Sequence, residues 1–231
     1  MSHNRERKVP GRMGPLLGRP LGQFLARIYW RTKVRGTRNV PRRGAVVVIA
    51  NHVGFIDGPV AAGVTPRASH FLVKTEMFKG PLGWLLRATG QIEVVGSGRE
   101  ALARARGVLQ QGGLVGVFPE GTRGTGDAAS LAGGAAWLAL HGSAPVVPLA
   151  LLGTRHTGES VNTWPRPGRR LVAEFGEPIR LDIPDALRGR DRQRHAEETV
   201  AQTLREHVRR VSRHWNMPLP TDDPLRERGH R

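Results

Sequence analysis

The sequence predicts an α/β fold: a mainly parallel sheet with helices on both faces, preceded by a basic amphipathic helix. Three observations favour it. Short apolar runs alternate with segments of helical periodicity along most of the 231 residues. Runs such as GAVVVIANH at 44–52 are apolar without alternation, which is typical of strands buried on both faces. A hydrophobic content of 39% is sufficient for one sizeable core.

These segments can be placed in order along the chain. We expect strands at 45–50, 70–74, 91–95, 114–118, 144–153 and 169–179. We expect helices at 21–33, 81–90, 99–113, 127–142 and 191–215. The chain then divides into a basic arm with its amphipathic helix at 1–33, a main domain at 34–216 and a disordered tail at 217–231. Residues 1–19, rich in Arg, Gly and Pro, are expected to be loose.

The first expected helix, LGQFLARIYWRTK at 21–33, carries an apolar stripe with arginines beside it. The stripe consists of Leu21, Phe24, Leu25 and Ile28. One interpretation is a helix packed on the domain. The other is a helix at a lipid interface, with Arg27 and Arg31 toward the headgroups and Trp30 toward the acyl chains. Both can hold, for different faces of the same helix.

The net charge of +17 is concentrated near the N-terminus. Residues 1–43 hold twelve Lys or Arg and one acidic residue, whereas residues 44–187 hold thirteen and eleven. A basic arm attracts either nucleic acid or an anionic membrane surface. A protein that stacks on bases needs aromatic side chains among its basic ones, but only 5% of this chain is aromatic. We therefore expect an anionic membrane as the partner and no nucleic acid.

Membrane contact is expected to be peripheral, at the cytoplasmic face. No apolar segment reaches the ~18 residues that indicate a transmembrane helix, and we find no signal-peptide pattern. The chain contains no cysteine. This excludes disulfides, thiolate zinc sites and cysteine nucleophiles.

A histidine and an aspartate follow the apolar run at 45–50. His52 comes at the carboxyl end of the expected strand, where parallel sheets place their binding and catalytic residues. Asp57 comes five residues later. On a continuous helix this spacing would turn the two side chains apart by about 140°. They meet only if the chain turns between them, which Gly54 permits. Asp57 could then orient His52 as a general base; the alternative is a strand-end histidine beside a helix-capping aspartate.

A second polar cluster, GVFPEGTRGTG at 116–126, follows another expected strand. The glycine-rich turn presents backbone N–H groups, Thr122 adds a hydroxyl and Arg123 adds a guanidinium that fits phosphate. An ordinary strand–helix connection with a solvated Arg123 is the alternative.

Four blocks together resemble the glycerolipid acyltransferase family, whose best-known members are the 1-acylglycerol-3-phosphate acyltransferases. The blocks are N-H-x4-D at 51–57, KTEMFKGPLGWLLRATGQIEV at 74–94, F-P-E-G-T-R at 118–123 and APVVPLALLGT at 144–154. The similarity covers about residues 34–182 and is more specific than any single block.

The resemblance implies a reaction and a role for each site residue. His52 would be the general base and Asp57 its orienting carboxylate, with direct attack on a thioester donor, either acyl-CoA or acyl-carrier protein. Arg123 and Lys74 would hold the phosphate of a lysophospholipid acceptor, and Glu120 would position its glycerol part. Backbone N–H groups near Gly121 would serve as oxyanion donors, with Thr122 beside them. No cofactor and no metal are implied.

Two positions depart from the family pattern. The first block often has serine where this chain has Gly54. The second block often ends G-x-I-x-V-D-R, where this chain has Val95 and Gly96, and Arg99 is a candidate replacement for the missing arginine. The expected acceptor is 1-acylglycerol-3-phosphate, which would give phosphatidic acid. Another lysolipid or a glycolipid is the alternative within the same chemistry.

Overall fold

A seven-stranded sheet forms the centre of the protein. The computed structural model describes residues 9–11, 13–119 and 128–222. In the order β1-β7-β6-β2-β5-β3-β4, all neighbouring strands are parallel except β6 and β7. The strands are β1 Lys33–Arg35, β2 Val46–Ala50, β3 His70–Lys74, β4 Ile92–Val94, β5 Leu114–Val117, β6 Val146–Leu152 and β7 Val172–Phe175. The predicted mainly parallel sheet is confirmed.

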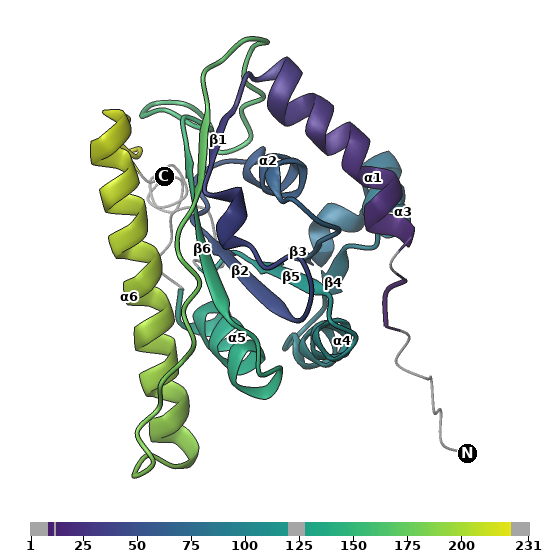
Figure 1. Ribbon diagram of the computed structural model, residues 1–231. Coiled ribbons are helices and arrows are strands. Elements are labelled where there is room, and N and C mark those ends of the chain that lie inside the picture. The colour runs from purple at the N-terminus through teal and green to yellow at the C-terminus, as the bar shows by residue number, and fades with distance from the viewer. Residues whose placement is uncertain (1–8, 12, 120–127, 223–231) are drawn as a thin grey trace, which may run out of the picture.

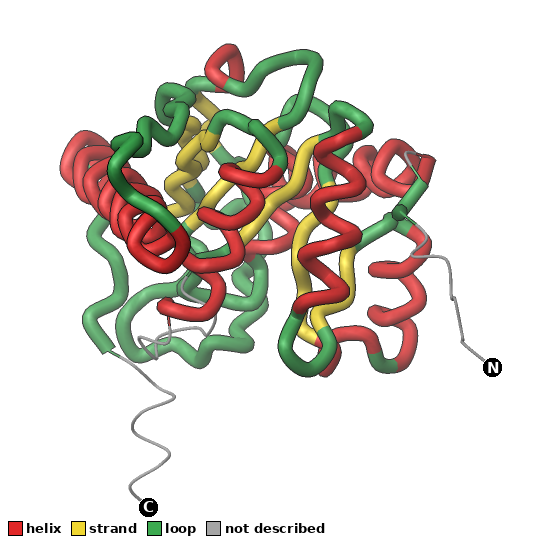
Figure 2. Tube along the Cα trace, turned by 90° about the horizontal axis from the view of Figure 1, so that it is seen from below, coloured by secondary structure: helices red, strands yellow, loops and turns green. Residues whose placement is uncertain are grey.

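Helices cover both faces of this sheet (Figure 1). One face carries α1 Met13–Gln23, the π-helix Phe24–Tyr29 that continues it, and α2 Asp57–Val64, with α3 Gly80–Ala88 beside α1. The other face carries α4 Arg99–Gln110, α5 Ala128–His141 and α6 Gly189–Trp215. Two short 3-10 turns lie at Thr37–Asn39 and Thr75–Phe78. Figure 2, seen from below, shows the strands running between the helices.

The central strand β2 shows why its apolar run has no alternation. Val46, Val48 and Ala50 pack into the core under α2 and the π-helix. Val47 and Ile49 point the other way, into the core under α4, α5 and α6. All five residues are buried, because successive side chains of a strand face opposite sides of the sheet and both sides are covered.

The N-terminal helix begins earlier than expected, so the prediction of a loose segment is wrong for residues 13–19. Gly14, Gly18 and Gly22 recur every four residues, which places them on one face of α1. A Cβ atom on Gly14 would lie 2.7 Å from the carbonyl oxygen of Ala88, and one on Gly22 would lie 3.1 Å from Cα of Gly63 in α2. The small face therefore fixes α1 on the domain by close backbone contact.

Two further expectations need correction. Trp30, which the lipid-interface interpretation directs toward acyl chains, is fully buried, and its indole N–H donates to the carbonyl of Pro165. Residues 217–222, expected in the disordered tail, lie against the domain, with Met217 and Leu219 packed on the core. Among the described residues, no helix is both long and apolar enough to cross a membrane.

Candidate active site

The site begins at the carboxyl end of β2. His52 follows this strand by two residues, and Phe118 follows the neighbouring parallel strand β5. Their rings stack with centroids 4.5 Å apart at an interplanar angle of 27°. Parallel strands end at the same edge of a sheet, so this edge brings together residues from separate parts of the chain.

His52 and Asp57 form the predicted pair. The Nδ1 atom of His52 lies 2.9 Å from Oδ2 of Asp57, the first residue of α2. The backbone N–H groups of Val53 and Gly54 donate to the same oxygen at 2.7 and 2.8 Å. A carboxylate only accepts hydrogen bonds, so Nδ1 is the donor in this pair, and in the neutral imidazole the lone pair is then on Nε2. Asp57 is fully buried, whereas the His52 side chain is 17% exposed.

The chain turns between the two residues, as predicted, but Gly54 contributes to the turn in a different way. Gly54 does not adopt a positive φ. Instead, a Cβ atom on Gly54 would lie 3.3 Å from Cβ of Arg155 and 3.5 Å from the carbonyl oxygen of Thr154. The glycine therefore permits a close approach of the β6–β7 connection to the turn, rather than an unusual backbone conformation.

Asn51 is a site residue to which the sequence reasoning gave no role. Its side-chain amide donates to the carbonyl of Leu151 at 2.9 Å and accepts from the N–H of Leu151 at 2.7 Å. Asn51 thereby joins the end of β2 to β6 and fixes the backbone that carries His52. The available signal was the asparagine of N-H-x4-D itself, a polar residue directly after a fully buried strand.

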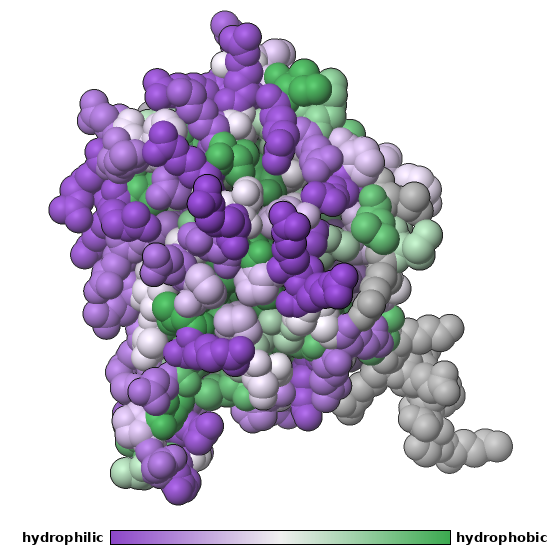
Figure 3. All heavy atoms as spheres, in the orientation of Figure 1, coloured by the Kyte–Doolittle hydropathy of each residue, from purple (hydrophilic) through white to green (hydrophobic). Residues whose placement is uncertain are grey.

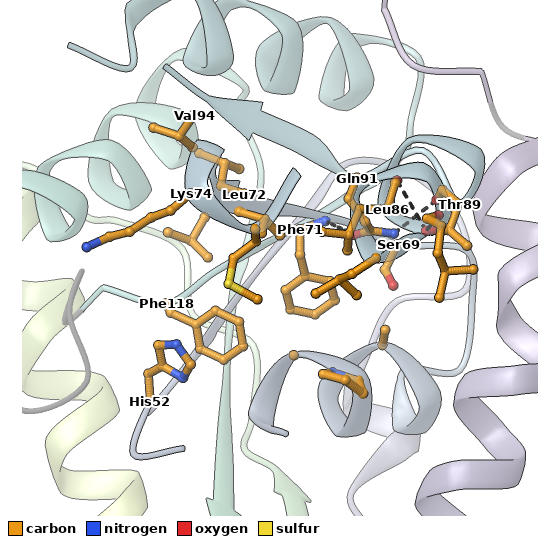
Figure 4. A pocket seen from close by; sticks show the side chains of 18 of the residues that line it. His52, Ser69, Phe71, Leu72, Lys74, Leu86, Thr89, Gln91, Val94 and Phe118 are labelled. Atoms are coloured by element: carbon orange, nitrogen blue, oxygen red, sulfur yellow. Dashed lines mark hydrogen bonds between the residues drawn. The ribbon is translucent and has the colours of Figure 1, made fainter. Parts of the chain in front are cut away.

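A large pocket opens from His52 and is lined mainly by the sheet and by α1, α2 and α3, with Leu102 of α4 and Gly134 of α5 also among its lining residues. Its volume is about 1080 Å³. Figure 4 shows His52 and Lys74 at one end, Ser69, Thr89 and Gln91 at the other, and Phe71 between them. The sides are mainly apolar and include Leu25, Leu72, Leu82, Leu85, Leu86 and Phe118. A long apolar pocket that meets the His52–Asp57 pair at one end suits a ligand with an extended apolar chain.

The other predicted site residues differ in exposure and in whether they line the pocket. Lys74 ends β3, is exposed, lines the pocket and makes no polar contact with the described residues. Arg99 is exposed at the first residue of α4, and it is the preceding Gly96, Ser97 and Gly98 that line the pocket. The phosphate-binding segment Glu120, Gly121, Thr122 and Arg123 lies outside the described residues, so its predicted role stays a prediction.

Comparison with known proteins decides the family. A sequence model of the family described as Acyltransferase matches residues 31–152, more than half of the chain. The protein belongs to the acyltransferase family. The resemblance inferred from the four blocks is thereby confirmed.

Individual relatives of this acyltransferase have sequence identities of 24–32% to it. It is 28% identical over 178 residues to a 1-acyl-sn-glycerol-3-phosphate acyltransferase of Bacillus subtilis, covering 75% of this chain and 86% of that protein. It is 32% identical over 154 residues to an uncharacterised protein of Mycobacterium tuberculosis, covering 59% of this chain and 41% of that protein. The crystal structure of the 1-acyl-sn-glycerophosphate (LPA) acyltransferase PlsC from Thermotoga maritima superposes with a TM-score of 0.57 at 24% identity, over 84% of this chain and 78% of that one. This last likeness shows that the fold is shared.

The family match divides the acyltransferase into two parts. Residues 31–152 run from β1 to β6 and contain each site residue predicted from the sequence. The β6–β7 connection, β7, α6 and the segment after α6 lie beyond the match. Contacts from these later elements to the turn at His52 therefore come from outside the matched residues.

Proposed function

We propose that this acyltransferase moves a fatty acyl group from a thioester donor to the free hydroxyl of a lysophospholipid. The proposed acceptor is 1-acylglycerol-3-phosphate, and the product is then phosphatidic acid. The observation that carries the proposal is the His52–Asp57 pair at the end of an apolar pocket of about 1080 Å³. The Bacillus subtilis relative, with 28% identity over most of its length, supports the choice of acceptor. The donor is acyl-CoA or acyl-carrier protein.

The geometry fits a single displacement without an acyl-enzyme. Nε2 of His52 takes the proton of the acceptor hydroxyl while its oxygen attacks the thioester carbonyl carbon. The tetrahedral intermediate then breaks its C–S bond, and the imidazolium returns the proton to the departing thiolate. Asp57 holds the ring in the required tautomer and stabilises the transient imidazolium. The chain has no cysteine to form an acyl-thioester of its own.

Binding of the substrates follows from the two ends of the pocket. The acyl chain lies in the apolar part, against Phe71 and Leu86. The phosphate of the acceptor lies at the His52 end, where Lys74 offers an ammonium group with no other polar partner among the described residues. Arg123, Glu120 and Arg99 complete the proposed acceptor site.

We also propose peripheral binding to an anionic membrane, at its cytoplasmic face. Large apolar side chains are exposed on α1 and the π-helix, namely Met13, Leu16, Leu21, Phe24 and Ile28. Figure 3 shows apolar surface over these helices and hydrophilic surface over α6. Trp84 of α3 and Trp164 of the β6–β7 connection are exposed as well. Exposed apolar groups flanked by arginines are typical of helices at a lipid interface.

One assay tests the reaction. Purified protein is given a long-chain acyl-CoA and matched lyso-acceptors with and without phosphate. We expect acyl transfer to the phosphate-bearing acceptors, and a loss of at least about 100-fold in kcat for His52→Ala, because general base catalysis contributes 10²–10⁴-fold. Turnover retained by folded His52→Ala would contradict the mechanism. Equal rates for all acceptors would instead favour another lysolipid or a glycolipid.

A further inference from the structure

A buried arginine outside the family match touches the turn that carries the catalytic pair. Arg155 lies in the β6–β7 connection, three residues after β6, and its side chain is 4% exposed. Its Nε donates to the carbonyl of Val53 at 2.9 Å. The rest of the guanidinium donates to the carboxylate of Asp222 at 3.0 and 3.1 Å, and to the carbonyls of Asp222 and Glu159. The hydrogen bonds thus point in two directions, toward the catalytic turn and toward the C-terminal segment.

Val53 is held through both of its backbone polar groups. Its N–H donates to Oδ2 of Asp57, the oxygen that also receives Nδ1–H of His52. Its carbonyl accepts from Arg155. The carbonyl of Val53 and the N–H of Gly54 belong to one planar peptide unit, so holding the carbonyl also fixes the direction of the Gly54 N–H, which donates to the same Oδ2 atom of Asp57 at 2.8 Å. Arg155 therefore acts on the hydrogen-bond network that orients His52, without touching His52 itself.

Asp222 balances the buried charge of Arg155 and belongs to the segment after α6. The helix ends at Trp215, and Asn216 turns the chain with a φ of 47°. The segment then runs to the β6–β7 connection, where the N–H of Thr221 donates to the hydroxyl of Thr157 and Asp222 accepts from the N–H of Gly158. A buried guanidinium without its carboxylate is strongly unfavourable. Asp222 is thus what allows Arg155 to stay under the turn.

We propose that Arg155 is a positioning residue for the catalytic base, held in place by Asp222 from the segment at 216–222. The proposal rests on the proposed function in one respect, that His52 is the base whose orientation limits the rate. Neither Arg155 nor Asp222 is among the residues that line the pocket. Their effect is on the geometry of the turn, so it falls on the catalytic step rather than on substrate binding.

The kinetic test uses Arg155→Met and Asp222→Asn in the full chain. A displaced base costs about 10- to 100-fold in rate when reacting groups lose alignment, so we expect kcat to fall by that factor in both variants. KM for donor and acceptor is expected to change by less than about threefold, because no group in contact with substrate is removed. Arg155→Lys should recover part of the rate, since an ammonium can reach either Val53 or Asp222. A loss carried by KM would overturn the proposal.

Arg169→Met is the matched control. Arg169 also pairs with a carboxylate within the β6–β7 connection, donating to both oxygens of Glu159 at 2.8 Å, but it contacts neither Val53 nor Asp57. We expect a loss of thermal stability in this variant with kcat within about twofold of wild type. If kcat falls as far in Arg169→Met as in Asp222→Asn, the role of the Arg155–Asp222 pair is only structural.

Amide hydrogen exchange gives a measurement that does not depend on activity. The N–H groups of Val53 and Gly54 both donate to Asp57, so we expect slow exchange of these two amides in the native protein. We expect these two amides to exchange at least about tenfold faster in Asp222→Asn than in wild type or Arg169→Met. Unchanged protection would overturn the proposal even if Arg155→Met does not fold. If His52→Ala remained active while the amides behaved as expected, the proposed reaction would fail and the coupling of Arg155 to the turn would stand.

Discussion

At the scale of single residues, the two oxygens of Asp57 have different surroundings. Oδ2 receives three N–H groups, from His52, Val53 and Gly54. Oδ1 is buried and has no partner among the described residues. A buried carboxylate is tolerated when its charge is matched by hydrogen bonds to the charged form. Because all three donors bind Oδ2, this one atom holds both the backbone of the turn and the imidazole of His52.

This arrangement predicts the effect of Asp57→Asn. The amide keeps the shape of the side chain, but it lacks the charge that stabilises the imidazolium, and its NH₂ group can face Nδ1 and favour the wrong tautomer. The same change in a Ser-His-Asp triad costs about 10⁴-fold in kcat, and we expect a loss of at least about 10³-fold here, measured with saturating donor and acceptor. Urea unfolding shows whether the variant is folded. Wild-type kcat in a folded Asp57→Asn protein would contradict the assigned role.

The spacing of His52 and Asp57 is informative in the sequence alone, whereas the residues that support the pair are not. The five-residue interval forces a turn, and the turn is present. Arg155 lies 102 residues from Val53 along the chain, and Asp222 follows later still, so no local pattern joins them to the turn. For Gly54, the sequence suggests only backbone freedom. The close approach of Arg155 to Gly54 is a tertiary contact, which no local pattern reveals.

At the scale of elements, strongly apolar segments could be predicted and weakly patterned ones could not. The strands β2, β3 and β6 have apolar runs whose side chains pack into the hydrophobic clusters on the two faces of the sheet. By contrast, β1 is three residues with two exposed basic side chains, and it exists through its pairing with β7. Helix α2, DGPVAAGV, consists of residues with weak or mixed helix propensity and is stabilised by packing against α1 and the π-helix.

The helical segment at 13–29 has one face on the domain and one face open, which predicts its membrane behaviour. Phe24 is 50% and Ile28 67% exposed. Burying such side chains in lipid contributes about 1.5–3 kcal/mol each, so Phe24→Ser combined with Ile28→Ser should weaken partitioning to anionic vesicles by more than about tenfold. Sedimentation with vesicles measures this.

Two arginine variants separate the apolar contribution from the electrostatic one. Arg27→Ser, on the π-helix, should weaken vesicle binding modestly and only at low salt, because surface charge is screened. Arg205→Ser, on the hydrophilic α6, should leave it unchanged (Figure 3). Equal losses for both arginines would indicate general charge attraction rather than a membrane-facing helix.

At the scale of the whole molecule, two buried histidines that do not line the pocket, His70 and His207, link stability to pH. His207 of α6 faces the carbonyl of Glu174 on β7, and His70 of β3 faces the carbonyl of Gly90. Burial lowers the pKa of both from the ordinary value of 6.5, more than these hydrogen bonds raise it; for His207 the nearby Arg210 lowers it further. Both histidines are therefore neutral in the folded protein at a pH where the unfolded chain is protonated.

The sign of the resulting pH dependence follows from proton uptake on unfolding. Below pH 6.5 the unfolded chain binds protons that the native His70 and His207 do not, so the free energy of unfolding falls as the pH drops from about 7 toward the lowered native pKa values. The lowered carboxylate pKa values of Glu159 and Asp222 act in a separate, more acidic range, because their ordinary values are 4.5 and 3.8.

We expect His207→Gln, whose amide can still donate to the carbonyl of Glu174, to flatten the pH dependence of the free energy of unfolding between pH 7 and 5. The loss of stability below pH 4.5 should remain in this variant. Urea unfolding at pH steps measures it, with His141→Gln as the exposed control at the end of α5. A slope in His207→Gln equal to that of the control would show that His207 does not contribute to the acid sensitivity of the fold.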